Sequence, residues 1–61
     1  MTIEQIRCEV TKDDLKTKSV YAMIENSGLY RILRIGKKVT IVNNAGKVKT
    51  VSPSVVIEIR M

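Results

Sequence analysis

Residues 29 to 51 read LYRILRIGKKVTIVNNAGKVKTV, and this stretch decides the fold because apolar and polar residues alternate along it. Alternation with a period of two is typical of antiparallel strands that have one buried side and one solvated side. The pattern is interrupted only at Gly36 and over residues 43 to 46, which read NNAG. Glycine and asparagine both favour turns. The stretch therefore predicts two consecutive β-hairpins.

The two turns also predict a register for these hairpins. A three-residue loop at 36 to 38 pairs Ile35 with Val39, and an even closure at 43 to 46 pairs Val42 with Lys47. We prefer this register because one side of the sheet then collects apolar residues only. That predicted core side consists of Leu33, Ile35, Val39, Ile41 and Val48. The opposite side collects Tyr30, Arg34, Thr40, Lys47 and Lys49, along with Ile32, Val42 and Val51.

The same region carries the excess positive charge of the chain. No acidic residue occurs between Glu25 and Glu58, and the net charge of the whole chain is +5. Such a concentrated field suits a phosphate backbone or an acidic protein surface. The alternative is a solvated side whose lysines only keep an edge strand from aggregating. We expect a nucleic-acid-binding surface made of Tyr30, Arg31, Arg34, Lys37, Lys38, Lys47 and Lys49.

The chain of 61 residues predicts one small domain, 1–61, with a thin margin of stability. Domains of this size usually need a disulfide, a metal or a second copy, so we expect homodimerisation. A single cysteine, Cys8, and no histidine exclude the usual zinc sites and cysteine–histidine nucleophiles, and we expect Cys8 in the core. We therefore expect no metal, no cofactor and no enzymatic activity.

The N-terminal sequence is too polar for a signal peptide, and no apolar run approaches the roughly 18 residues of a membrane span. These features predict a cytoplasmic protein that does not use a membrane as a partner.

The N-terminal half is less decisive. Residues 2 to 10 alternate in a way that favours a strand, with a helix as the alternative. Thr11, followed three residues later by Asp14, is a variant of the capping box that begins helices, so we expect a helix over about residues 12–26. In a competing interpretation residues 19–25 form a strand that turns back at 25 to 29. The sequence alone leaves this choice open.

After Pro53, residues 55 to 61 resume alternation and predict a last strand. The predicted fold class is α+β, in which one helix, about 12–26, packs on a small antiparallel sheet with C-terminal hairpins. The alternative is an all-β small barrel.

Residues 18–41, KSVYAMIENSGLYRILRIGKKVTI, resemble the winged-helix DNA-binding domains of the excisionase and MerR type. In that family a helix with an S-x-V-Y-x-x-I pattern precedes a basic wing, which Arg34 to Lys38 would form here. The resemblance implies DNA binding, with a recognition helix over residues 18 to 26, and TIEQI is similar to the first helix of the family. GKVKTVSPS is more distantly similar to KOW and integrase C-terminal barrels, which also bind nucleic acid.

The predicted function is non-catalytic binding of DNA or RNA, as a small regulator. With two tyrosines as the only aromatic residues, binding through charge and shape is favoured over a stacking platform. The alternative is a small regulator or inhibitor that docks on an acidic surface of a larger protein.

Overall fold

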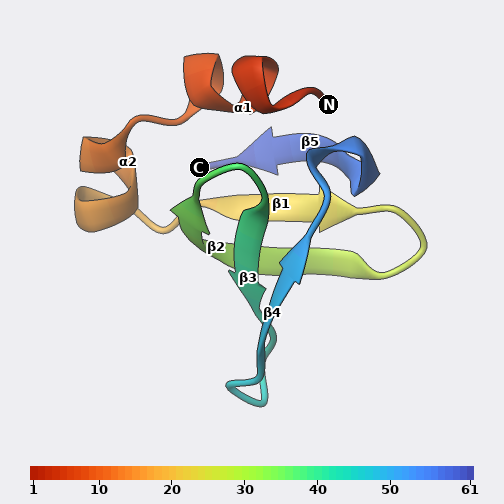
Figure 1. Cartoon of the computed structure of the whole chain (residues 1–61). Helices are drawn as coiled ribbons and strands as arrows, with labels where there is room; N and C mark the ends of the chain where they lie inside the picture. Colours follow the sequence, from red (N-terminus) through yellow and green to blue (C-terminus); the bar gives the residue numbers. More distant parts are fainter.

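A computed structural model describes all 61 residues, and it shows a curled antiparallel sheet with two short helices at one end (Figure 1). The strands follow the order β4-β3-β2-β1-β5, so four of them form a meander and the fifth returns to pair with the first. The elements are α1 (Ile3–Glu9), α2 (Lys12–Thr17), β1 (Tyr21–Ile24), β2 (Gly28–Ile35), β3 (Val39–Val42), β4 (Val48–Val51), the 3-10 helix η1 (Pro53–Val55) and β5 (Val56–Arg60).

The predicted helix over residues 12–26 is wrong beyond Thr17, and with it the α+β fold of one helix packed on a sheet. Residues 21 to 24 form β1, the strand between β2 and β5, so the architecture is dominated by the sheet. The buried residues Val20, Ala22 and Ile24 recur every second position, as a strand requires. The competing strand interpretation of this segment is therefore correct, and the recognition helix implied over 18 to 26 is not formed.

The turn between β1 and β2 explains why the chain reverses at this point. Asn26 and Gly28 have φ angles of 61° and 92°, in the left-handed region that asparagine and glycine adopt most readily.

The N-terminal segment is a helix, so the strand predicted over residues 2 to 10 is wrong. Thr2 and Gln5 form a capping box, in which the Thr2 hydroxyl accepts from the Gln5 N–H at 3.2 Å. Ile6 and Val10 lie one helical turn apart and are buried, whereas Cys8 is exposed rather than in the core. Burial along one side of a helix explains why period-two alternation was misleading here.

The first hairpin confirms the predicted pairing of Ile35 with Val39, but a β-bulge changes the register further along β2. Ile32, not Leu33, pairs with Ile41, because Leu33 is the extra residue of the bulge. As a result Ile32 is only 3% exposed, while Leu33 is 45% exposed. The assignment of Leu33 to the core side is therefore wrong.

The second hairpin has a longer loop than predicted, so Val42 pairs with Val48 rather than with Lys47. The side-chain oxygen of Asn43 accepts hydrogen bonds of 2.9 Å from the backbone N–H groups of Ala45 and Lys47. This side-chain turn accommodates one additional residue. A shift of one residue reverses the sides of a strand, and Val48 is consequently 58% exposed instead of buried.

One core fills the space between the curled sheet and α1. Its buried members are Ile6, Val10, Val20, Ala22, Ile24, Ile32, Val39, Ile41 and Val56. The N-terminal ammonium group of Met1 donates to the carbonyl oxygen of Val56 at 2.6 Å, which fixes the start of the chain beside β5. Neither helix has the length and apolar composition needed to cross a lipid bilayer.

Candidate functional site

The residues predicted to bind nucleic acid do not share one side of the sheet. Residues directly opposite each other in an antiparallel pair point to the same side. Tyr30 lies opposite buried Ala22, and Lys49 lies opposite buried Ile41, so both point to the inner side, which contains the core. Arg31 and Arg34 lie opposite Val42 and Thr40, on the outer side. The bulge and the longer loop cause this separation.

The structure instead brings cations together around a cavity between the helices and the end of β2. This cavity, hereafter the helix pocket, has a volume of about 550 Å³. A smaller hollow of about 210 Å³ shares four of its residues and extends it toward Val10 and Thr11. The helix pocket is lined by Arg7, Lys12, Leu15, Lys16, Leu33, Arg34 and Ile35. Four of these side chains are cationic and none is acidic.

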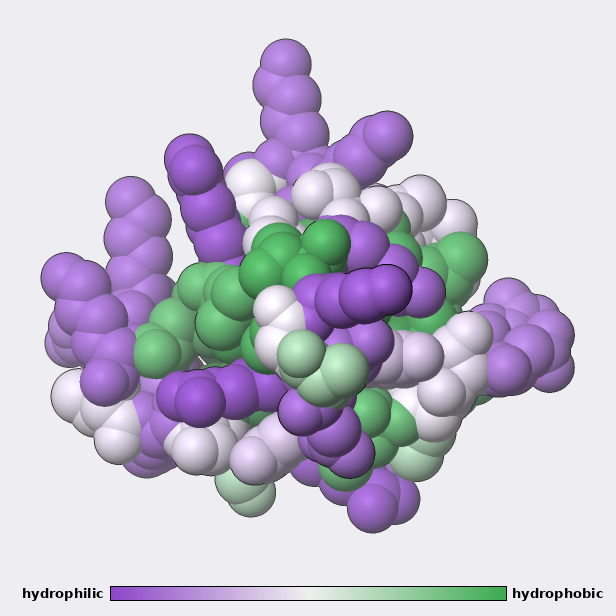
Figure 2. All heavy atoms as spheres, turned by 90° about the horizontal axis from the view of Figure 1, so that it is seen from below, coloured by the Kyte–Doolittle hydropathy of each residue, from purple (hydrophilic) through white to green (hydrophobic).

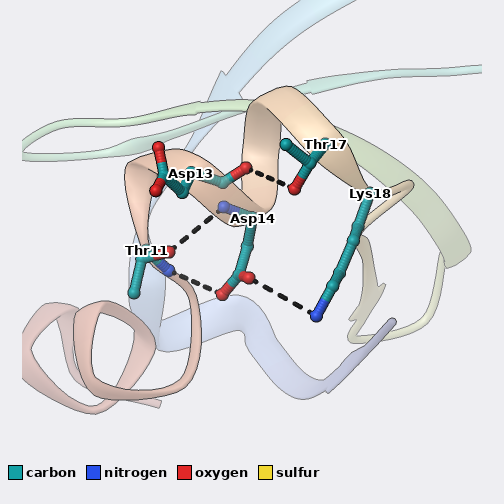
Figure 3. A network of polar contacts seen from close by, with 5 residues as sticks. All are labelled: Thr11, Asp13, Asp14, Thr17 and Lys18. Carbon is teal, nitrogen blue, oxygen red and sulfur yellow. Dashed lines mark hydrogen bonds and ion pairs between the residues drawn. The ribbon is translucent and has the colours of Figure 1, made fainter.

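The geometry of α2 explains why lysines and not aspartates line the helix pocket. Lys12, Leu15 and Lys16 have the i, i+3, i+4 spacing that places side chains on one side of a helix. The carboxylate of Asp14 is engaged elsewhere, since it accepts from the Thr11 N–H at 3.0 Å and pairs with Lys18 at 3.7 Å (Figure 3). Asp14 thus stabilises the start of α2 and does not neutralise the cations of the pocket.

Electrostatics at the start of α2 are consistent with this capping role. The backbone N–H of Thr11 holds the pKa of Asp14 below the ordinary aspartate value of 3.8. Desolvation opposes this effect, and the Thr11 hydroxyl and Lys18 lower the pKa further. The Thr17 hydroxyl donates to the carbonyl oxygen of Asp13 at 2.8 Å within the same helix (Figure 3). The capping box predicted at Thr11 and Asp14 is confirmed.

Strand β2 contributes the other wall because it is longer than its neighbour β1. Pairing with β1 ends where the Ile32 N–H donates to the Val20 carbonyl oxygen at 2.8 Å, and α2 packs beside the residues beyond it. Leu33, Arg34 and Ile35 of this part of β2 line the helix pocket.

Helix α1 is tied to the same end of the sheet. The Nη2 atom of Arg7 donates to the carbonyl oxygen of Gly36 at 3.1 Å. This bond places the Arg7 guanidinium next to the turn that carries Lys37 and Lys38, two of the predicted binding residues. Of the residues predicted to bind nucleic acid, Arg34 lines the helix pocket, and the turn with Lys37 and Lys38 adjoins it through Arg7.

Sequence reasoning missed three cations of the helix pocket, namely Arg7, Lys12 and Lys16. They belong to the N-terminal segment, whose acidic residues balance its basic ones and conceal any local excess. The signal that would have found Lys12 and Lys16 is their spacing around Leu15 in a helix that begins at the Thr11 cap. No comparable signal in the sequence places Arg7 beside them.

A second group of predicted residues gathers at the far end of the sheet. This distal cluster consists of Tyr30, Asn43, Lys47, Val48 and Lys49, around a hollow of about 210 Å³. The Nζ atom of Lys49 lies 5.2 Å from the centroid of the Tyr30 ring, within the range of a cation–π interaction. The distal cluster therefore combines an aromatic ring with two cations, also without an acidic neighbour.

Apolar side chains also reach the surface away from the helix pocket. On the outer side of the sheet, Tyr21, Arg31, Val42 and Val48 lie opposite one another across four strands. Figure 2 shows apolar surface in the middle of the view from below, flanked by long hydrophilic side chains.

No group of three or more histidine, cysteine, aspartate or glutamate side chains is arranged to hold a metal ion. Comparison of the chain with known protein families, curated proteins and solved structures gives no match. The site must therefore be interpreted from its own geometry.

Proposed function

We propose that this protein binds nucleic acid without catalysing a reaction, and that the helix pocket is the principal contact. The observation that carries the proposal is the convergence of four cations from three separate elements on one concave, acid-free site. Arg7 comes from α1, Lys12 and Lys16 from α2, and Arg34 from β2.

Like charges held around one cavity repel each other and lower the stability of the fold. Solubility alone does not call for this arrangement, since scattered surface lysines keep a protein soluble equally well. Phosphate groups relieve the repulsion, and they release condensed counterions when cations neutralise them. A partner with closely spaced phosphates therefore matches the helix pocket better than a solvated surface does.

The distal cluster supplies a second set of contacts in this proposal. Lys47 and Lys49 can neutralise further phosphates, and Tyr30 offers a ring on which a base can stack. Lys37 and Lys38 extend the positive surface from the helix pocket along the turn after β2.

Two double charge reversals test the proposal and locate the contact. Lys12→Glu with Lys16→Glu removes pocket cations, and Lys47→Glu with Lys49→Glu changes the net charge equally at the distal cluster. Binding of fluorescein-labelled DNA and RNA is measured by fluorescence anisotropy at low salt. We expect the first pair to abolish binding and the second pair to weaken it. Equal losses would show that net charge, not the pocket, governs binding, and no binding by the wild-type protein would refute the proposal.

The second candidate function is docking on an acidic surface of a larger protein. The row of Tyr21, Val42 and Val48 around Arg31 favours it. Tyr21 and Val48 are exposed and Val42 is half-buried, and apolar surface on a sheet is more typical of protein interfaces than of phosphate contacts. Poly-glutamate serves as the discriminating probe in the same titration. Binding of poly-glutamate as tight as that of nucleic acid of equal charge would favour the protein partner.

A further inference from the structure

We infer that the helix pocket selects single-stranded nucleic acid, and that it holds one unpaired nucleotide with the base on an apolar floor and the phosphates on the surrounding cations. This inference rests on the proposed function and names the form of nucleic acid that the site takes. The apolar floor consists of Leu15, Leu33 and Ile35.

The exposure of Leu33 is the first step in the argument. Leu33 lies within an eight-residue strand, yet the bulge places it outside the core with 45% of its surface exposed. An exposed leucine on its own would be unremarkable. Here it lies next to Arg34 in a cavity with two further apolar residues, so the same concave surface offers apolar contact and positive charge.

A ligand that satisfies both parts of this surface must be amphiphilic and anionic. The backbone of a duplex presents phosphates and sugars, while its bases stay stacked inside, so it would leave the apolar floor in contact with water. An unpaired nucleotide presents its phosphate and the face of its base together. The apolar floor therefore favours an unpaired nucleotide over a duplex.

The volume and the residue types of the pocket agree with this assignment. A volume of about 550 Å³ lies within the roughly 300–1,000 Å³ of sites that bind small organic ligands, so it is sufficient for one nucleotide. The pocket contains no aromatic ring, but arginine guanidinium planes also stack on bases, and Arg7 and Arg34 both line it. The scarcity of aromatic residues in the chain therefore does not argue against an unpaired base at this site.

The test compares three fluorescein-labelled DNA probes of equal phosphate number: a single strand, the same strand with abasic sites, and a hairpin duplex. We expect the intact single strand to bind several-fold more tightly than the abasic strand, because the abasic strand has no base to cover the apolar floor. The duplex should bind no better than the abasic strand. Anisotropy titrations at one salt concentration give all three affinities.

A matched pair of variants assigns the effect to the pocket. Leu33→Ser alters the apolar floor, while Leu29→Ser alters a leucine of the same strand and the same 45% exposure that does not line the pocket. Leu33→Ser should reduce the preference for the intact strand to less than about twofold, and Leu29→Ser should keep it. Thermal unfolding by circular dichroism confirms that both variants fold.

The outcomes separate this inference from the proposed function. Equal affinity for intact and abasic strands, or an unchanged preference in Leu33→Ser, would overturn the inference while the binding of nucleic acid stands. The comparison of intact and abasic strands needs only the wild-type protein, so it tests whether a base is bound whatever the stability of the variants. Absence of binding to every probe at low salt would overturn the proposed function and the inference together.

Discussion

Replacing Arg34 by glutamine should change the salt dependence of binding by an amount that follows from the number of cations in the helix pocket. Each phosphate neutralised on a single strand contributes about −0.7 to the slope of log affinity against log salt concentration. Arg34 is one of the four cations of the pocket, so Arg34→Gln should make the slope shallower by about 0.7 than that of the wild-type protein. Between 50 and 200 mM salt, the fall in affinity should therefore be about 2.6-fold smaller for the variant than for the wild-type protein.

The control for this measurement is Arg31→Gln. Arg31 belongs to the same strand, is also exposed and, like Arg34, lies on the outer side of the sheet, but it does not line the pocket. Anisotropy titrations at four salt concentrations give the slopes of all three proteins. The Arg31→Gln slope should equal that of the wild-type protein. Equal slopes for the two variants would refute the reasoning, because they would show that phosphates are neutralised by the general field of the surface.

Three further predictions concern the fold that supports the pocket. Thr11→Ala removes the cap of α2 and should cost about 1 kcal/mol of local helix stability, measured by amide hydrogen exchange. Because the folded-state pKa of Asp14 is lowered, the contribution of its carboxylate to the free energy of unfolding is complete above about pH 3.8 and is lost as the pH falls through the lowered value. An NMR titration of the carboxylate measures this pKa, and a value at or above 3.8 would contradict the prediction. Ile41→Ala should destabilise the protein by about 2–5 kcal/mol in urea, whereas Val48→Ala, at an exposed position, should cost less than about 0.5 kcal/mol.

The hairpins, their turns and part of the core could be predicted because local chemistry determines them. The alternation is interrupted at Gly36, where the chain turns, and Val39 and Ile41 flank Thr40 in the buried pattern that the structure shows. The Thr11 cap was likewise predictable, since capping depends on residues three positions apart. The length of the helix after this cap could not be predicted, because residues 19 to 25 include both helix formers and strand formers. Pairing of β1 with two neighbouring strands decides in favour of the strand.

The helix pocket was only partly predictable for a related reason. A bulge at Leu33 adds one residue without disturbing the apolar pattern enough to be noticed, and the Asn43 side chain lengthens the next loop in the same way. Each shift is small, yet together they divide the predicted binding surface between two sides of the sheet. The pocket itself depends on how α1 and α2 pack against β2, and this contact between distant segments leaves no periodic signal in the sequence.

The bulge also bears on how this surface can change over evolutionary time. Ile32 pairs with Ile41 on one side of the bulge, and Arg34 pairs with Thr40 on the other, so a strand without Leu33 would continue in regular register. Loss or gain of a single codon would therefore leave every buried residue of the hairpin in place. A surface that can acquire or lose its exposed leucine by one insertion or deletion is free to diverge while the core beneath it stays unchanged.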